Sequence, residues 1–209
     1  MSLHYEILDE QRKALLPLFK PIRELGFYLA GGTALALQLG HRDSIDFDFF
    51  IEDSFDTEGL FKKLTEVFRG YTLVRVQEEK DTLVLVINDE IRVSFMTYAY
   101  PLITPMFETE FFSLASLVDI GCMKLSAITS RSVFKDYVDL YFILHEVTLA
   151  ELIKKLQLKM PTLDPLLALK SLVYFDDIIL EELLFKVEPV PFETIKIELI
   201  KIVKEYKYT

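Results

Sequence analysis

The chain has little cysteine, glycine or proline and no long hydrophobic run. Its single cysteine, Cys122, excludes an intramolecular disulfide and suits a reducing compartment. Seven glycines and eight prolines in 209 residues are too few for a low-complexity chain. No stretch reaches about 18 uncharged apolar residues, and residues 1–20 carry charges throughout, so we expect neither a membrane span nor a signal peptide. These absences favour a cytoplasmic protein with no membrane partner.

Positive charge is also in the minority: 23 Lys and Arg stand against 33 Asp and Glu, for a formal net charge of -10. A general nucleic-acid coat takes its affinity from lysines and arginines on phosphates, so this class of function is disfavoured. A small nucleotide held by a metal ion and a few basic groups is still compatible with the composition, since a bound cation reverses the local sign. A hydrophobic fraction of 51% allows a full core, in one domain or in two small ones packed together.

The pattern of the first hundred residues predicts strands and helices in alternation, and therefore an α/β (α+β) fold with a mixed sheet and flanking helices. One or two short helices are expected before Leu25, interrupted by Pro17 and Pro21. The Asn88-Asp89 pair suits a tight hairpin turn. Strands are expected at residues 27–30, 44–51, 72–77, 82–87 and 91–98, with helices at 33–39 and 57–68.

After Pro101 and Pro105 the pattern becomes helical. Helices are predicted at residues 117–128, 133–146, 149–158, 166–175 and 192–206. We therefore expect a first domain at residues 1–105 and a helical domain at residues 106–209 that completes a cleft.

Asp46 and Asp48 stand two residues apart in a strand-like segment. Side chains at this spacing leave the same face of a strand, so both carboxylates converge on one point. Such a pair repels unless a proton or a metal offsets the charge, and Mg²⁺ suits an all-oxygen site that also takes phosphate oxygens. A solvated strand face would explain the same two residues without a metal.

Gly31-Gly32-Thr33 lies between a predicted strand and a predicted helix. Glycine permits close backbone approach, and free amides at a helix N-terminus favour an anion, although an ordinary turn has the same composition. The spacing matches neither the dinucleotide fingerprint nor a P-loop. Together with the Asp-x-Asp strand that follows, it would bring phosphate-binding amides beside a metal site.

These segments resemble a known motif. Residues 29–50, from Leu-Ala-Gly-Gly-Thr through Arg-Asp-Ser-Ile-Asp-Phe-Asp, are similar to the first motif of the polymerase-β-type nucleotidyltransferases. More narrowly, the chain resembles the AbiEii/AbiGii toxin family of type IV toxin–antitoxin and phage abortive-infection systems. Residues 120–128 resemble that family's helix with an inward lysine, and residues 131–144 its later Asp-bearing helix. Residues 172–177 are similar to its C-terminal segment.

The resemblance assigns the catalytic centre to the first motif. It implies that Asp46 and Asp48 hold Mg²⁺, which bridges the triphosphate of an NTP substrate during in-line displacement at the α-phosphate. It also implies that Gly31, Gly32 and Thr33 contact the nucleotide phosphates. A magnesium-dependent, nucleotide-binding transferase is the function that follows.

Basic and polar residues outside the carboxylate pair complete the implied site. Arg42 and Ser44 match the motif's Arg-x-Ser, and would brace the carboxylate strand or contact phosphate. Lys124 would neutralise phosphate charge as a point cation.

Two aspartates on the later helix have two readings. Asp136 and Asp139 lie three residues apart, so both can point into the cleft, Asp136 as a catalytic residue and Asp139 toward the nucleotide. Both can equally pair with Lys124 or Arg131 as structural ion pairs.

The chain departs from the superfamily at the third carboxylate. The strand expected to carry it is residues 90–96, and Ser94 stands at that position, while Asp89 and Glu90 belong to the preceding turn. Serine is a poor Mg²⁺ ligand and no base near neutral pH. The chain would then transfer slowly, recruit a base from elsewhere, such as Asp136 or the substrate, or lack activity.

Three functions are therefore weighed. The first is a Mg²⁺-dependent nucleotidyltransferase of the toxin type, with RNA, especially tRNA, or a protein as acceptor. The second is a catalytically weak nucleotide-binding module that occupies a partner such as a cognate antitoxin. The third is a small-molecule nucleotidyltransferase of the antibiotic-modifying type. A cleft lined by basic residues such as Lys124, Arg131 and Lys135 would favour RNA, and an acidic cleft a cationic small molecule.

The remaining chemically versatile residues are expected to be structural. His4, His41 and His145 show no metal-ligand spacing and are expected at the surface or in local hydrogen bonds. Cys122 falls on an apolar helix, as a buried thiol does. Tyr137, and Tyr141 one turn further on, can stack on a base, but their helical spacing favours core packing.

Overall fold

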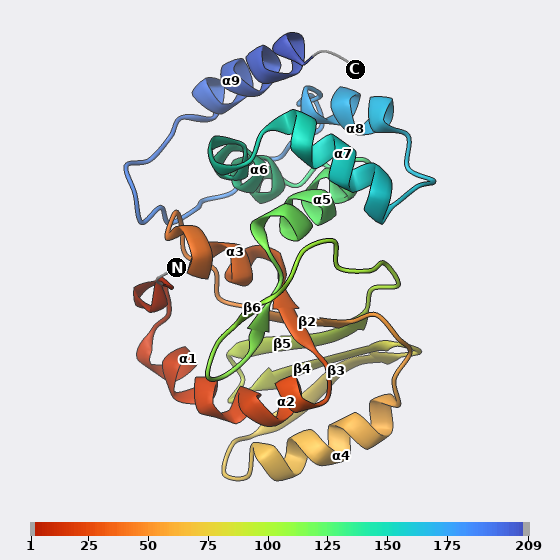
Figure 1. The fold of residues 1–209 in the computed structure, drawn as a ribbon. Helices are drawn as coiled ribbons and strands as arrows, with labels where there is room; N and C mark the ends of the chain where they lie inside the picture. The colour runs from red at the N-terminus through yellow and green to blue at the C-terminus, as the bar shows by residue number, and fades with distance from the viewer. Residues whose placement is uncertain (1–2, 207–209) are drawn as a thin grey trace.

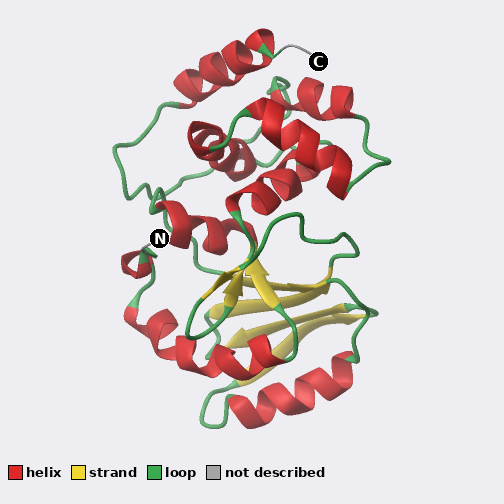
Figure 2. Ribbon diagram, viewed as in Figure 1, coloured by secondary structure: helices red, strands yellow, loops and turns green. Residues whose placement is uncertain are grey.

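A mixed sheet of seven strands lies within residues 28–114, and a group of helices stands above it (Figure 1). The computed structural model describes residues 3–206. The N-terminal helices and α4 cover one face of the sheet, and α3 and α5 lie on the other side, between the sheet and the remaining helices (Figure 2). The predicted α/β class with a helical second half is confirmed.

The strand order is β3-β4-β5-β2-β1-β7-β6. β2 runs parallel to β5 and antiparallel to β1, so the strand that carries Asp48 lies at the centre of the sheet. The strands are β1 (Tyr28–Ala30), β2 (Phe47–Ile51), β3 (Leu73–Glu79), β4 (Thr82–Ile87), β5 (Ile91–Thr97), β6 (Phe107–Glu108) and β7 (Ser113–Leu114).

The helices of the second half follow the predicted pattern closely, while the N-terminal region is more broken than predicted. Instead of one or two helices, short α and 3-10 segments alternate there, with Pro17 and Pro21 close to the starts of two of them, where a missing N–H costs little. The helical segments are η1 (Tyr5–Ile7), α1 (Glu10–Leu15), η2 (Leu16–Phe19), α2 (Lys20–Glu24), α3 (Gly31–Leu39), α4 (Thr57–Val67), α5 (Leu117–Ala127), α6 (Phe134–Glu146), α7 (Leu149–Lys159), α8 (Pro165–Leu172) and α9 (Phe192–Glu205).

The sheet extends past the domain boundary expected between residues 105 and 106. β6 and β7 were not predicted. β7 pairs in parallel with β1, the strand that ends at the Gly31-Gly32 turn. Each of these strands is two residues long, too short for an alternating pattern to be visible in the sequence. The division into two domains at residues 105/106 stays a prediction.

Aromatic packing decides which face of β2 looks into the interior. Phe47 and Phe49 are fully buried, and their ring centroids lie 4.7 and 5.0 Å from that of Phe19. Because alternate side chains leave opposite faces of a strand, this packing turns Asp48 and Phe50 to the other face. The core of the first half therefore orients the carboxylate of Asp48.

Helix α5 is the central element of the second half, with α6 and α7 packed against it. Gly121 lets α5 approach α7 closely, since a Cβ there would lie 2.8 Å from a methyl carbon of Leu152. A fully buried ion pair joins the same two helices, with Lys159 Nζ 2.8 Å from Asp119 Oδ1. Within residues 3–206, no helix has the length and apolar character that crossing a bilayer would require.

An irregular segment between α8 and α9, residues 173–191, runs back to the first half of the chain (Figure 1). The backbone N–H of Asp43 donates to Leu184 at 2.8 Å, and that of Lys186 donates to His41 at 3.0 Å. These two backbone hydrogen bonds fix the segment against the loop between α3 and β2.

We expect Phe19→Ala to lower the free energy of unfolding by about 3–5 kcal/mol, because it removes a fully buried ring from the Phe47 and Phe49 cluster. Urea denaturation followed by circular dichroism measures this change. Leu158, which is 60% exposed, provides the control, and its replacement by alanine should change stability by no more than about 0.5 kcal/mol. Equal losses in both variants would contradict the packing described.

Candidate active site

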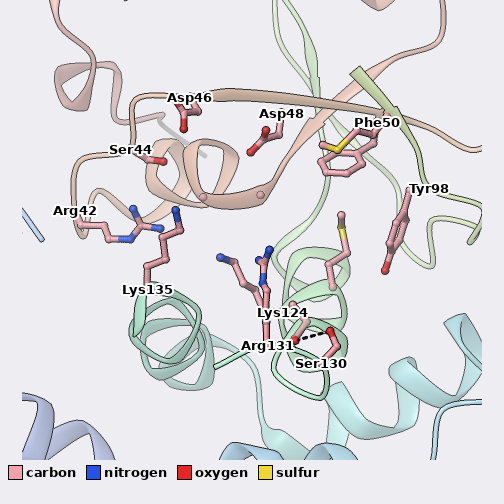
Figure 3. A pocket seen from close by; sticks show the side chains of 15 residues that line it. Arg42, Ser44, Asp46, Asp48, Phe50, Tyr98, Lys124, Ser130, Arg131 and Lys135 are labelled. Atoms are coloured by element: carbon pink, nitrogen blue, oxygen red, sulfur yellow. Dashed lines mark hydrogen bonds between the residues drawn. The ribbon is translucent and has the colours of Figure 1, made fainter. Parts of the chain in front are cut away.

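A cleft of about 410 Å³ opens between the centre of the sheet and helices α5 and α6 (Figure 3). One side comes from the Gly-Gly turn and β2, and the other from α5, the loop after it and the start of α6. The lining residues are Gly31, Gly32, Arg42, Ser44, Asp46, Asp48, Phe50, Met96, Tyr98, Met123, Lys124, Ala127, Ser130, Arg131 and Lys135.

The carboxylates of Asp46 and Asp48 both line this cleft. Burial raises the pKa of Asp48, a hydrogen bond from Ser94 opposes that shift, and the neighbouring charge of Asp46 adds to it. Gly31 has a φ of +73°, and a Cβ there would lie 3.1 Å from Asp48 Oδ2. A glycine at this position therefore lets the backbone turn directly beneath the carboxylate.

The second glycine makes room for the Arg-x-Ser part of the motif. A Cβ on Gly32 would lie 2.9 Å from Arg42 Nη2 and 3.0 Å from Ser44 Oγ. Helix α3 begins at this turn, and no side chain caps its first amides. The uncapped amides, the guanidinium and the hydroxyl together form a surface suited to an anion.

Thr33 lies behind this surface and does not line the cleft, being 1% exposed. Its hydroxyl donates to the carbonyl of Asp46 and lies 2.9 Å from Ser44 Oγ. The side chain therefore fastens the segment before β2 to helix α3, which braces the carboxylate strand.

Basic side chains face the carboxylates from the other side of the cleft. Figure 3 shows Lys124, Arg131 and Lys135 reaching toward Asp46 and Asp48 from α5, the loop that follows it and the start of α6. Opposite charges thus face each other across the space, an arrangement that suits phosphate groups bridged to a cation.

Two of these basic side chains, Lys124 and Arg131, form ion pairs with buried aspartates of α6. Lys124 Nζ lies 2.6 Å from Asp136 Oδ1 and 2.6 Å from Asp139 Oδ2. Arg131 Nε lies 2.9 Å from Asp136 Oδ2. Both aspartates are fully buried and absent from the cleft lining. Of the two roles considered for them, their contacts in this structure are those of structural ion pairs.

Asp139 also reaches the loop of the first motif, 97 residues earlier in the chain. Arg42 donates through Nε at 2.7 Å and through Nη2 at 2.8 Å, a bidentate pair. Burial alone would raise the pKa of Asp139, but the charges of Lys124 and Arg42 and the bonds it accepts hold that pKa well below its usual range.

The expectation for His41 was wrong. His41 is 1% exposed, and its Nε2 lies 2.9 Å from Asp139 Oδ1, which is neither a surface nor a local contact. Within the described residues its Nδ1 has no partner. Burial lowers the pKa of His41, and the hydrogen bond and charge of Asp139 only partly oppose the shift. His41 and Asp139 are 98 positions apart, so no local sequence pattern could predict their contact.

Ser94, which the sequence interpretation puts where a third carboxylate is expected, lies on β5 beside the strand that carries Asp48. Ser94 pairs directly with Asp48 between β5 and β2. Among residues 3–206, no group of three or more His, Cys, Asp or Glu side chains is placed to hold a metal ion. Asp89 and Glu90 occupy the hairpin turn, Asp89 with a φ of +58°, as expected.

Cys122 and Tyr137 are buried in the helical half, as predicted. The cleft also contains residues that the sequence interpretation did not select: Phe50, Met96, Tyr98 and Met123. The signal that could have found Phe50 is its spacing, because it continues the two-residue period of Asp46 and Asp48.

The chain matches a protein family over most of its length. Residues 14–191 match the family described as the nucleotidyl transferase AbiEii toxin of type IV toxin–antitoxin systems. An uncharacterized protein of Aquifex aeolicus is 39% identical over 194 residues, covering 88% of this chain and 90% of its own length.

Solved structures share the fold. MenT4, a nucleotidyltransferase toxin from Mycobacterium tuberculosis, superposes with a TM-score of 0.63 at 15% identity, covering 93% of this chain and 83% of its own. The antibiotic-resistance factor ANT(2'')-Ia superposes with a TM-score of 0.52 at 13% identity, covering 74% of this chain and 94% of its own. At such identities the likeness concerns the fold, which can host different acceptors.

The buried His41 predicts a pH dependence of stability. Its pKa in the folded protein lies below the ordinary value of 6.5, so the unfolded chain binds the proton more readily. Stability should therefore fall as the pH drops from about 6.5, by at most about 1.4 kcal/mol per pH unit from this group. Urea titrations between about pH 5 and 7 should show a weaker fall in His41→Gln than in the wild type.

The control for this titration is His145→Gln, because the side chain of His145 is 45% exposed. It should follow the wild-type pH dependence. Parallel curves for His41→Gln and the wild type would contradict a contribution from the buried imidazole.

Proposed function

The chain belongs to the AbiEii nucleotidyltransferase toxin family, and from this we propose that it transfers a nucleotidyl group from an NTP in a Mg²⁺-dependent reaction. The observation that carries the proposal is the pair Asp46 and Asp48 facing the basic side chains of α5 and α6 beside the Gly31-Gly32 turn. In-line transfer at an α-phosphate needs positioning and charge stabilisation above all, and both are offered by fixed groups in this cleft.

The donor set around Asp46 and Asp48 fits Mg²⁺. Burial raises the pKa of Asp48 and the neighbouring charge of Asp46 adds to that shift, a cost to the ionised Asp48 carboxylate that a cation would offset. Mg²⁺ is commonly held by one or two carboxylates together with substrate phosphates and water, so two aspartates suffice as protein ligands. When bound, the ion would neutralise charge on the phosphates.

The basic residues would bind and orient the rest of the triphosphate. Lys124 and Arg131 are held in place by Asp136, and Arg42 by Asp139, so their charged ends are positioned before a ligand arrives. Such preorganisation lowers the entropic cost of binding. In this assignment Asp136 and Asp139 act as positioning residues.

An RNA end, as in tRNA, is the acceptor that this electrostatic pattern favours. Lys124, Arg131 and Lys135 line the cleft from the helical half, although the chain as a whole carries a net charge of -10. A basic lining repels the cationic small molecules expected of an antibiotic-modifying enzyme. Family membership also supports a cognate antitoxin protein as a partner. A role in abortive infection is part of the same proposal.

The proposal is tested by incubating the protein with each labelled NTP and Mg²⁺, with and without total RNA. Asp46→Asn and Asp48→Asn should each reduce label transfer by at least about 100-fold, because each removes a charge that offsets the cation at the reacting phosphate. Asp53→Asn, an exposed residue just beyond β2, should transfer like the wild type. Transfer that survives both substitutions in the cleft would refute the assignment.

A second candidate, a nucleotide-binding module with weak catalysis, is favoured by Ser94. A positioned general base contributes about 10²–10⁴-fold to a rate, and a serine paired with Asp48 cannot act as one near neutral pH. In this case the protein binds NTP but turns it over slowly, and acts by occupying its partner.

Ser94→Asp separates the two candidates. If the missing carboxylate limits turnover, the variant should transfer label at least about tenfold faster at saturating Mg²⁺, and thermal unfolding should show that Mg²⁺ stabilises it more than it stabilises the wild type. Ser94→Asn controls for side-chain size. A rate equal to the wild type, in a variant that binds NTP normally, would mean that the base comes from another group or from the substrate.

A further inference from the structure

The cleft has an apolar end, directly continuous with its carboxylates. Asp46, Asp48 and Phe50 follow one another at every second position, and all three line the cleft. On the neighbouring strand Ser94 pairs with Asp48, and Met96 pairs with Phe50. One row along the sheet is therefore polar, and the next is formed by an aromatic ring and a thioether.

This apolar end is closed by Tyr98 on the sheet side and by Met123 of α5 on the opposite side. Phe50, Met96, Tyr98 and Met123 are all partly exposed to the cleft. We refer to these four residues as the apolar wall. Half-buried apolar side chains gathered in one concave place form a surface that gains free energy when a ligand covers it.

The rings of the apolar wall are held in fixed orientations. The ring of Phe50 stacks on that of Tyr28, with centroids 6.1 Å apart and an interplanar angle of 30°. Its centroid lies 5.9 Å from that of Tyr98, in an edge-to-face contact. Because neighbouring rings already support Phe50 and Tyr98, a planar ligand would meet surfaces that need no reordering.

Tyr98 presents its ring, and not its hydroxyl, to the cleft. The hydroxyl oxygen is buried and has no hydrogen-bond partner among the described residues. Burial raises the pKa of Tyr98, which keeps this hydroxyl neutral. The part of Tyr98 that can contact a ligand is therefore the aromatic face or edge.

We propose that the apolar wall binds the nucleobase of the nucleotide, by stacking and apolar contact. The inference rests on the proposed function, which places the phosphates between Asp46, Asp48 and the basic side chains. With the triphosphate drawn to that charged end, the neutral, planar part of the same molecule faces the adjoining apolar end. Stacking on aromatic side chains is a common way to hold a base, and it favours a flat ring over a flexible alkyl chain.

The test compares two ligands in the presence of Mg²⁺, ATP and inorganic tripolyphosphate, by isothermal titration calorimetry on the full chain. Phe50→Ala and Tyr98→Ala should each weaken ATP binding roughly tenfold. Neither should change the affinity for tripolyphosphate, which has no base. Tyr98→Phe should bind ATP like the wild type, because the ring and not the hydroxyl faces the cleft.

Tyr174→Ala, at a tyrosine that is 46% exposed, follows α8 and does not line the cleft, is the matched control and should bind both ligands like the wild type. Unchanged tripolyphosphate binding in the wall variants also shows that they are folded. Phe50→Leu, which retains apolar volume without a ring, should lose part of the ATP affinity and so separates stacking from simple packing.

Two outcomes overturn the inference while leaving the proposed function intact. One is wild-type protein that binds ATP no more tightly than tripolyphosphate. The other is a set of wall variants with normal ATP affinity that are impaired only in their KM for the RNA acceptor, which would assign the wall to the acceptor. Wild-type protein that binds neither ligand would instead refute the nucleotide site itself.

Discussion

The carboxylate of Asp139 is the contact on which the geometry of the cleft depends. Asp139 lies on α6 and is fully buried. Its carboxylate contacts Lys124 from α5, and Arg42 and His41 from the loop before β2. Burying a single ionised carboxylate is costly, and the cost is offset only when charged partners surround it. The helical half and the first motif can therefore pack together at this point only in the arrangement that brings those partners to Asp139.

This arrangement explains how an acidic protein can present several basic side chains in one cleft. Asp136 and Asp139 lie behind Lys124, Arg131 and Arg42 and fix where their charged ends point. The charged ends line the cleft while the aspartates do not. The net charge of -10 describes the whole surface, whereas a ligand in the cleft experiences the few cations that the buried aspartates hold toward it.

Short-range sequence patterns predict the strands, the helices and part of the site, but not the contacts between distant segments. The two-residue period placed Asp46 and Asp48 on one face, and the position of Ser94 in its strand placed it opposite Asp48. The partnership of Arg42 and His41 with Asp139 joins residues 97 and 98 positions apart, and no local period encodes such a distance. Partly exposed aromatic residues such as Phe50 and Tyr98 have the same sequence signature as core residues, so only the fold reveals that they border a cleft.

The segment between α8 and α9 contacts the first motif, so residues that are translated late support residues that are translated early. The loop at residues 41–43 receives Asp139 from α6, and it exchanges backbone hydrogen bonds with Leu184 and Lys186. A ribosome makes the glycine turn and the carboxylate strand early, but their supports emerge only after most of the chain has been translated. A nascent chain would thus carry the first motif without these contacts until α6 and residues 184–186 have been made, so the cleft would be completed later than the strand that carries Asp48.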